Sequence, residues 1–193
     1  MEIFTPILLI FFSYLIGSLS AAIIVCKTMY LPDPRSMGSN NPGATNVLKL
    51  GGKKAAAITL LGDCLKGLIP ILVALYLDFN ELSLSLVAFA AFIGHLYPVF
   101  FNFKGGKGVA TAFGVFIGLS WQVAILVLVT WLIIIKIFKL SSLGALVTAL
   151  LAPLYFYLLS GSLYFTGVSI VLSILLIYKH KTNIVKIIDG TED

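Results

Sequence analysis

Three short stretches rich in glycine, lysine or serine each stand immediately before a long apolar run. Residues 51–54 read Gly-Gly-Lys-Lys, residues 105–108 read Gly-Gly-Lys-Gly, and the third stretch begins with Ser141 and Ser142. We expect each to form a helix N-terminus, where unpaired N–H groups, the helix dipole and accessible glycine backbone attract anions. One such stretch alone also suits an ordinary turn, with the serines as helix caps. The three together predict a phosphate-binding site.

The polar segment 33–49 is long for a simple connection, since most connections between helices are a handful of residues. Its hydroxyl and amide side chains can donate hydrogen bonds, and the planar guanidinium of Arg35 suits a pair of phosphate oxygens. Pro42 and Gly43 indicate a turn within the segment. We therefore interpret it as part of the same anion site rather than as a linker.

Near the end of the chain, His180 and Asn183 share one helix face if the last helix continues through them. The isoleucines at 184, 187 and 188 are spaced as in an amphipathic turn at a membrane surface. His180 is either a solvated terminal residue or a member of the site, and this segment alone favours neither.

Two charged residues, Asp63 and Lys66, lie three positions apart inside an apolar run. Isolated charges in a membrane cost several kcal/mol, so we expect them to pair with each other or with a facing helix. His95, close to Pro98, is interpreted as a hydrogen-bonded packing residue. Gly17 begins a set of small residues spaced for close helix packing.

Several familiar catalytic patterns are absent from the sequence. A nucleotide P-loop needs glycine five residues before Gly106, where Phe101 stands, and Ser or Thr in place of Gly108. There is no Gly-x-Ser-x-Gly or His-Glu-x-x-His, and neither histidine has Asp five residues on. The acidic residues outside the apolar runs lack metal-ligand spacing, and Cys26 and Cys64 both lie in apolar runs. We expect no metal, no cofactor and no covalent nucleophile.

The composition indicates what kind of protein must position these residues. The chain of 193 residues is 60% hydrophobic and 11% charged, with a mean hydropathy of +1.07. A soluble domain carries about 25% charged residues, so soluble and disordered proteins are both excluded. The net charge of +5 is distributed between apolar runs, which favours anionic lipid or a phosphorylated small molecule over nucleic acid as a partner.

We predict an all-α polytopic membrane protein, a single domain over residues 1–193, because a spanning helix needs about 20 apolar residues. No Lys or Arg precedes the first apolar run, so we expect an uncleaved first span rather than a signal peptide. The seven expected transmembrane helices are 3–26, 55–77, 83–102, 108–119, 121–138, 143–160 and 162–178.

The basic residues predict the orientation of these spans. All 13 Lys and Arg residues except Lys66 fall in 27–54, 103–108, 136–142 or 179–193. The positive-inside rule then places the N-terminus outside and the C-terminus in the cytoplasm. The fourth segment is short, about 18 Å as a helix against a hydrocarbon core of about 30 Å. If this segment were re-entrant, the lysines after it would lie on the opposite side of the membrane from Arg35 and Lys104. We therefore expect it to span, and we expect the loop 104–108 before it to dip into the membrane.

Three motifs resemble the signature motifs of one family. They read SNNPGATNVLK at 39–49, FKGGKGVAT at 103–111, and His180-x-x-Asn183 followed by Gly-Thr-Glu at 190–192. In this order they resemble the bacterial membrane-integral acyl-phosphate:glycerol-3-phosphate acyltransferases, the PlsY family. The sequence departs from the family pattern at Asn40, where the family has Gly, and at Lys49, where Arg is common. Lysine lacks the bidentate fork of arginine.

The resemblance implies transfer of a fatty acyl group from acyl phosphate to the 1-hydroxyl of glycerol 3-phosphate. The products are lysophosphatidic acid and phosphate, in the first step of phospholipid synthesis. It also implies a bacterial inner-membrane location among membrane lipid, an active site facing the cytoplasm, and a functional link to the enzyme that makes acyl phosphate. We expect a monomer and no nucleic-acid partner.

The resemblance further implies roles for individual residues. The loop 104–108 would bind glycerol 3-phosphate, and His180 and Asn183 would orient the attacking hydroxyl. Lys104 and Ser142 are counted with these two as catalytic residues. The residues expected to bind substrate are Arg35, Ser39, Asn41, Gly43, Thr45, Asn46, Lys49, Gly105, Gly106, Lys107, Gly108 and Ser141.

An organophosphate or phosphate transporter of the inner membrane is the alternative of another class, since it would use a similar basic, glycine-lined site. The sequence contains no inverted repeat and no paired broken helices in matching halves, which transporters of this kind commonly have. A scaffold protein would leave the polar segment 33–49 without a role.

Overall fold

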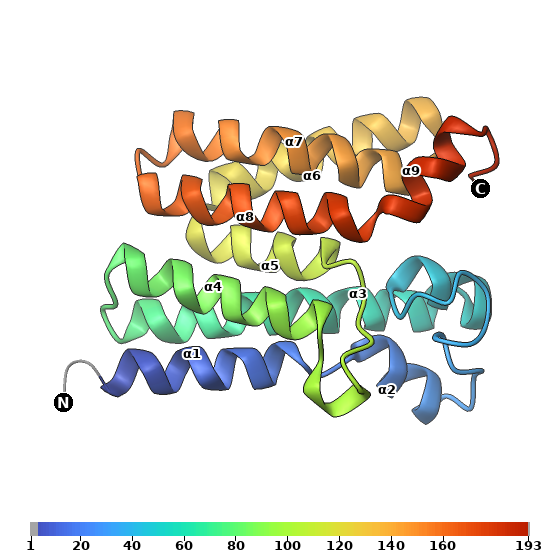
Figure 1. Ribbon diagram of the computed structural model, residues 1–193, viewed down its shortest axis with the longest axis horizontal. Helices are drawn as coiled ribbons and strands as arrows, with labels where there is room; N and C mark the ends of the chain where they lie inside the picture. The colour runs from blue at the N-terminus through green and yellow to red at the C-terminus, as the bar shows by residue number, and fades with distance from the viewer. Residues whose placement is uncertain (1–3, 193) are drawn as a thin grey trace. The chain divides into compact units, whose positions relative to one another are not determined.

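The computed structural model describes residues 4–192, which form α-helices and one short 3₁₀ helix, with no strand in that range (Figure 1). The all-helical prediction is confirmed. The chain forms two compact units that divide between Val115 and Phe116. The elements are α1 (Phe4–Gly17), α2 (Ala21–Thr28), α3 (Ala44–Tyr76), α4 (Glu81–Leu96), η1 (Val99–Phe101), α5 (Val109–Leu119), α6 (Trp121–Phe138), α7 (Ser141–Leu159), α8 (Leu163–Lys179) and α9 (Lys181–Ile188).

Four helical segments are long and apolar enough to cross a membrane: Ala44–Tyr76, Glu81–Phe101, Trp121–Phe138 and Ser141–Leu159. The pair α1 and α2, bent by 43°, and the pair α8 and α9, bent by 59°, each qualify if the pair forms one broken span. Residues 4–192 therefore provide 4 spans, or up to 6 with the bent pairs. The helix α5, with 11 residues, corresponds to the short fourth segment expected at 108–119.

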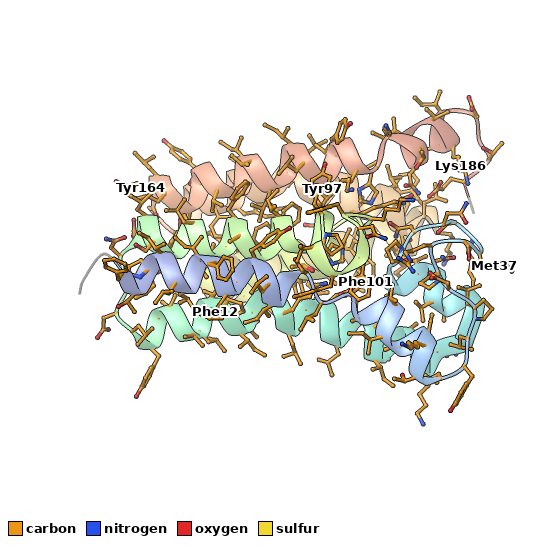
Figure 2. All side chains as sticks on the ribbon, turned by 60° about the horizontal axis from the view of Figure 1, so that its bottom comes forward. Phe12, Met37, Tyr97, Phe101, Tyr164 and Lys186 are labelled. Atoms are coloured by element: carbon orange, nitrogen blue, oxygen red, sulfur yellow. The ribbon has the colours of Figure 1, made fainter. Side chains whose placement is uncertain are left out.

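Large apolar side chains lie on the outside of these helices. Phe12 on α1 and Tyr164 on α8, both labelled in Figure 2, are each 52% exposed, and they are two of many. Monomeric soluble proteins rarely expose contiguous apolar surface on this scale, whereas lipid solvates it. The exterior is that of an integral membrane protein.

In the first unit, α1 and α4 lie side by side (Figure 1). They approach closely because glycine replaces larger residues at the contact. A Cβ on Gly17 would overlap the backbone of Ala91, and a Cβ on Gly94 would overlap the carbonyl of Tyr14. The expected role of Gly17 in close helix packing is confirmed.

The chain is interrupted between α1 and α2, and the exposed backbone groups there find partners. Ser20 caps α2 by accepting a hydrogen bond from the N–H of Ile23 at 3.5 Å. The carbonyl of Leu19 accepts a hydrogen bond from Nζ of Lys66 at 2.7 Å. A side chain of α3 therefore provides the hydrogen-bond partner for a carbonyl group at the break before α2.

The long helix α3 has a kink at Gly52, whose φ of 76° and ψ of −174° are not helical. A helical segment thus begins directly after the Gly-Gly pair, as predicted. The expected span begins only at residue 55, whereas the structure has a further helical segment before the kink, since residues 44–51 are also helical. They are held by a buried cluster that joins α2 to α3, consisting of Ala22, Val25, Cys26, Val47 and Ala55.

The start of α5 packs against α3 at two further glycines. A Cβ on Gly67 would overlap the carbonyl of Thr111, and a Cβ on Gly114 would overlap the carbonyl of Cys64. The two backbones therefore touch along the first two turns of α5. This contact brings the residues that follow the loop 104–108 next to the charged residues of α3.

In the second unit, α6 packs on α7 and α7 packs on α8. Gly144 in the first turn of α7 leaves room for the indole of Trp131, since a Cβ there would lie 2.9 Å from its Cδ1. Thr130 and Tyr155 share a hydrogen bond of 2.9 Å between their hydroxyl groups. The rings of Phe116 and Phe156 meet edge to face at 5.2 Å.

The close contact between α1 and α4 predicts that one glycine substitution destabilises the protein and that a second, made elsewhere, does not. Gly94→Ala should destabilise the protein by about 1–3 kcal/mol, because the added methyl group overlaps backbone that cannot rotate away. Gly167→Ala in α8 is the matched control, since nothing lies within 4 Å of its Cβ position. Thermal unfolding in detergent measures both. Equal unfolding temperatures for the two variants would contradict the close contact.

Candidate functional site

The loop 104–108 is built by a tight reversal after α4. The helix ends at Leu96, η1 follows, and Asn102 and Phe103 adopt left-handed backbone with φ of 53° and 58°. Tyr97 and Phe101, labelled in Figure 2, lie at the beginning and end of this turn. The carbonyl of Tyr97 is held by the hydroxyl of Tyr14 at 2.9 Å. The turn directs the glycine-rich loop back onto the end of α4.

The glycines of this loop are in backbone contact with their surroundings. The N–H of Gly106 donates to the carbonyl of His95 at 3.2 Å. A Cβ on Gly106 would overlap Nε2 of His95 and lie 3.0 Å from the carbonyl of Pro42. Gly108 has a φ of +90° and lies against the ring of Phe92. The structure therefore brings the loop 104–108 into contact with the polar segment that contains Pro42.

The two lysines of the loop differ in burial. Lys104 is exposed, whereas Lys107 is half-buried between Gly106 and Gly108. The helix α5 begins one residue after Gly108, whose carbonyl accepts the N–H of Ala112 at 2.8 Å. The first turn of α5, its dipole and two cationic side chains are thus adjacent in sequence and space.

Asn46 organises the polar segment from within. It is 2% exposed, and its Oδ1 accepts the N–H of Ser39 at 3.0 Å. Its Nδ2 donates to the carbonyls of Pro34 and Met37 at 2.9 Å and 3.0 Å. The amide that we expected to bind substrate is used to shape the loop, so its side chain supports the site rather than facing a ligand.

Arg35 forms a two-pronged pair with Asp33. Its Nη2 lies 2.6 Å from Oδ2 and its Nε lies 3.0 Å from Oδ1 of that carboxylate. The hydrogen bond from Arg35 lowers the pKa of the Asp33 carboxyl, and the same hydrogen bond raises the pKa of the guanidinium. The pair is partly exposed, so a phosphate group would compete with Asp33 for the same fork.

The remaining predicted residues of this segment surround the start of α3. Ser39, Thr45 and Lys49 are exposed and Asn41 is half-buried. Gly43 is the N-cap of α3, with an extended backbone and no side-chain cap. The N–H groups of the first turn, which the sequence did not predict at this position, are therefore accompanied by hydroxyl and amide donors.

In the second unit, Ser141 and Ser142 occupy the first turn of α7. The expectation that they cap this helix is wrong, because Leu140 stands at the N-cap position and makes no side-chain cap bond. Ser142 is 6% exposed, and its Oγ has no hydrogen-bond partner among residues 4–192, as is also true of Nε1 of Trp131. Leaving such a buried group unsatisfied costs about 1–3 kcal/mol, which a hydrogen bond to a ligand would recover.

His180 and Asn183 would share one helix face if the last helix continued through both, but it does not. The chain bends at His180, where α8 ends and α9 begins, because the backbone leaves helical geometry there. His180 is 3% exposed, and its Nδ1 donates to the carbonyl of Leu176 at 2.8 Å. A carbonyl can only accept, so Nδ1 carries a proton and Nε2 is the acceptor in the neutral ring. Asn183 Nδ2 donates to Oε1 of Glu192 at 2.5 Å.

The pairing of Asp63 with Lys66 is confirmed. Lys66 Nζ lies 2.8 Å from Asp63 Oδ1, and both side chains are buried. His95 from α4 joins them, with Nδ1 at 3.6 Å from the same oxygen. The sequence pattern indicated only a packing role for His95, because its approach to Asp63 depends on how α3 and α4 pack. Among residues 4–192 no group of three His, Cys, Asp or Glu side chains is placed to hold a metal ion.

These features define an integral membrane protein whose loops and helix starts suit phosphorylated ligands. A family profile described as glycerol-3-phosphate acyltransferase matches residues 7–190. The chain is 52% identical over 187 residues to a glycerol-3-phosphate acyltransferase of Ruthia magnifica subsp. Calyptogena magnifica, covering 97% of this chain and 95% of the relative. It is 54% identical over 185 residues to one from Methylococcus capsulatus, covering 96% and 93%.

Two solved structures are similar over nearly the whole chain. Both are crystal structures of PlsY (YgiH), an integral membrane glycerol 3-phosphate acyltransferase. The glycerol 3-phosphate form matches with a TM-score of 0.94 at 37% identity, covering 98% of this chain and 94% of that one. The lysophosphatidic acid form matches with a TM-score of 0.91 at 36% identity. The chain belongs to the glycerol-3-phosphate acyltransferase family and is an integral membrane acyltransferase of phospholipid synthesis.

The buried ion pair yields a prediction about stability. Asp63→Ala should destabilise the protein by about 3–5 kcal/mol, because it leaves Lys66 as an uncompensated buried charge. The double variant Asp63→Ala/Lys66→Ala should be less destabilised than the single one. Unfolding in detergent compares the two. Additive losses would mean that the two side chains do not stabilise each other.

Proposed function

We propose that the protein transfers a fatty acyl group from acyl phosphate to the 1-hydroxyl of glycerol 3-phosphate. The products are lysophosphatidic acid and inorganic phosphate. Family membership supports this activity, as do the two PlsY structures, which are a glycerol 3-phosphate form and a lysophosphatidic acid form.

One observation in the chain itself carries the proposal. The loop 104–108 and the segment that contains Pro42 are in contact at Gly106, so two anion-binding loops are adjacent in the first unit. Two phosphorylated reactants require two such sites next to each other. Cationic side chains and the backbone N–H groups of two helix starts supply the opposing charge.

Roles for individual residues are part of the same proposal. Lys104, Lys107 and the backbone of Gly105, Gly106 and Gly108 hold the phosphate of glycerol 3-phosphate. In the first unit, donors around the start of α3 are assigned to acyl phosphate, with Asn46 keeping their loop in shape. In the second unit, the first turn of α7 is assigned to acyl phosphate on the family resemblance. The donors proposed for acyl phosphate are Arg35, Ser39, Asn41, Gly43, Thr45, Lys49, Ser141 and Ser142. His180 and Asn183 orient the attacking hydroxyl.

The reaction needs no nucleophile from the protein, because acyl phosphate is already a reactive mixed anhydride. The 1-hydroxyl oxygen attacks the acyl carbonyl carbon, and the bond between that carbon and the phosphate oxygen breaks. The hydroxyl proton leaves with the phosphate. The protein contributes by positioning both reactants and by donating hydrogen bonds to the oxygen that gains negative charge, for which the buried hydroxyl of Ser142 is available.

The finer topology belongs to the same proposal. Seven spans, with α5 as a short fourth, place the N-terminus outside and the basic loops in the cytoplasm of a bacterial inner membrane. The whole chain acts as one acyltransferase domain and as a monomer, with its active site facing the cytoplasm. An enzyme that makes acyl phosphate must supply the acyl donor.

The activity is tested by phosphate release from acyl phosphate by the purified protein, with and without glycerol 3-phosphate. Release should depend on glycerol 3-phosphate, show intersecting initial-rate lines and persist in excess EDTA. Lys104→Ala should lower kcat/KM by roughly 10–100-fold through a lost charge-assisted hydrogen bond, whereas Lys136→Ala at the end of α6 should not. Release that is independent of glycerol 3-phosphate, or a trapped acyl-enzyme, would contradict direct transfer.

The topology predicts accessibility to an impermeant thiol reagent. In a cysteine-free background, Glu81→Cys should label from outside intact cells, whereas Lys186→Cys should label only after the cells are opened. The two positions lie at the start of α4 and within α9, on opposite sides of the proposed membrane. Labelling of both from the same side would overturn the proposed orientation.

A further inference from the structure

A buried cluster of charged groups lies next to the loop 104–108, and the proposed chemistry makes no use of it. Asp63, Lys66 and His95 are only 2%, 6% and 6% exposed. Lys66 Nζ lies 2.8 Å from Asp63 Oδ1, and His95 Nδ1 lies 3.6 Å from the same oxygen. Burying charge in an apolar interior is costly and seldom more stable than apolar packing, so this cluster requires a reason other than stability.

His95 connects the cluster to the loop. Its backbone carbonyl accepts the N–H of Gly106 at 3.2 Å, and its Nε2 occupies the space that a Cβ on Gly106 would need. The two ring nitrogens therefore face different groups, Nδ1 toward Asp63 and Nε2 toward the backbone of Gly106. Because glycine places no side chain between them, the imidazole packs directly against the backbone of the loop.

The cluster also holds the elements around the loop. Lys66 donates to the carbonyl of Leu19 at 2.7 Å, at the break between α1 and α2. Its neighbour Gly67 packs against the backbone of Thr111 in the first turn of α5. Asp63 on α3 thus lies close to His95 of α4, the helix before the loop. Through the contact of Gly67 with Thr111, the same part of α3 also packs against α5, the helix after the loop.

We propose that the cluster of Asp63, Lys66 and His95 fixes the loop 104–108, and that His95 is a positioning residue for glycerol 3-phosphate. This inference rests on the proposed function, which assigns the loop to the phosphate of that substrate. His95 acts through Gly106 and so through the placement of Lys104 and Lys107, not through contact with the reacting atoms. A displaced loop weakens the binding of glycerol 3-phosphate, while the bound complex still reacts.

The first test is the kinetic effect of His95→Ala in the purified full-length protein. The KM for glycerol 3-phosphate should rise about tenfold or more, whereas kcat and the KM for acyl phosphate should change less than about threefold. Ser85→Ala is the matched control on the same helix. Ser85 is also buried, its hydroxyl has no hydrogen-bond partner among residues 4–192, and its loss should change none of these constants.

The second test asks whether the imidazole itself sets the loop. Gly106→Ala should raise the KM for glycerol 3-phosphate, since the new methyl group overlaps Nε2 of His95. In a His95→Ala background the overlap with the imidazole is gone and only the 3.0 Å approach to the carbonyl of Pro42 remains, so adding Gly106→Ala should raise this KM much less, by at most about twofold. Gly105→Ala is the control, because its methyl group would overlap the backbone carbonyl of residue 95, which remains after the substitution. The fold-increase in KM caused by Gly105→Ala should therefore be the same in the wild-type and His95→Ala backgrounds.

Two outcomes would overturn the inference. A fall in kcat with an unchanged KM would make His95 a catalytic group, and an equal penalty for Gly106→Ala in both backgrounds would show that the imidazole does not set the loop. If His95→Ala does not fold, His95→Gln, which fills the space but lacks the imidazole, replaces it in the KM comparison of the first test. The rise in unfolding temperature on adding glycerol 3-phosphate reports binding without turnover. A wild type that binds but does not transfer acyl groups would therefore contradict the proposed function and leave the test of His95 intact.

Discussion

In an apolar environment, no water is available to bond with the N–H and C=O groups that are freed wherever a helix is interrupted. Two such interruptions in the first unit obtain their partners from side chains or backbone elsewhere in the unit. At the break between α1 and α2, Lys66 bonds to the carbonyl of Leu19. At the turn after α4, Tyr14 bonds to the carbonyl of Tyr97, and Gly106 bonds to the carbonyl of His95. Much of the placement of the polar residues in this unit follows from this requirement.

Several polar residues that look like ligands are also occupied by partners within the protein. Asn46 closes its own loop with three hydrogen bonds, and Arg35 is paired with Asp33. The hydroxyl of Ser142 differs, because it is buried and has no partner within residues 4–192. The hydroxyl of Ser142 is thus distinguished from the amide of Asn46 by its hydrogen bonds, although both side chains are polar and buried.

The sequence predicts much of the fold because apolar runs and local spacing are sufficient for it. The helices, the small-residue contact at Gly17 and the pairing of Asp63 with Lys66 depend on residues close in the chain or on composition. The additional helix at 44–51, the bend at His180 and Leu140 at the N-cap of α7 depend on tertiary packing and backbone geometry, which no local pattern specifies. For the same reason the approach of His95 to Asp63, and its contact with Gly106, could be found only from the structure.

The end of the chain folds back on α9, since the N–H groups of Thr191 and Glu192 donate to the carbonyl of Lys186 and Glu192 also accepts from Asn183. This arrangement bears on how the protein is produced for study. An affinity tag or fluorescent reporter attached after residue 193 would follow closely on Glu192, which bonds to the Asn183 side chain that we assign to substrate orientation. Steric crowding or added charge from such a fusion would then change the measured rates without any change in the enzyme's own sequence. Preparations for kinetics are better made with a cleavable fusion or a long flexible spacer.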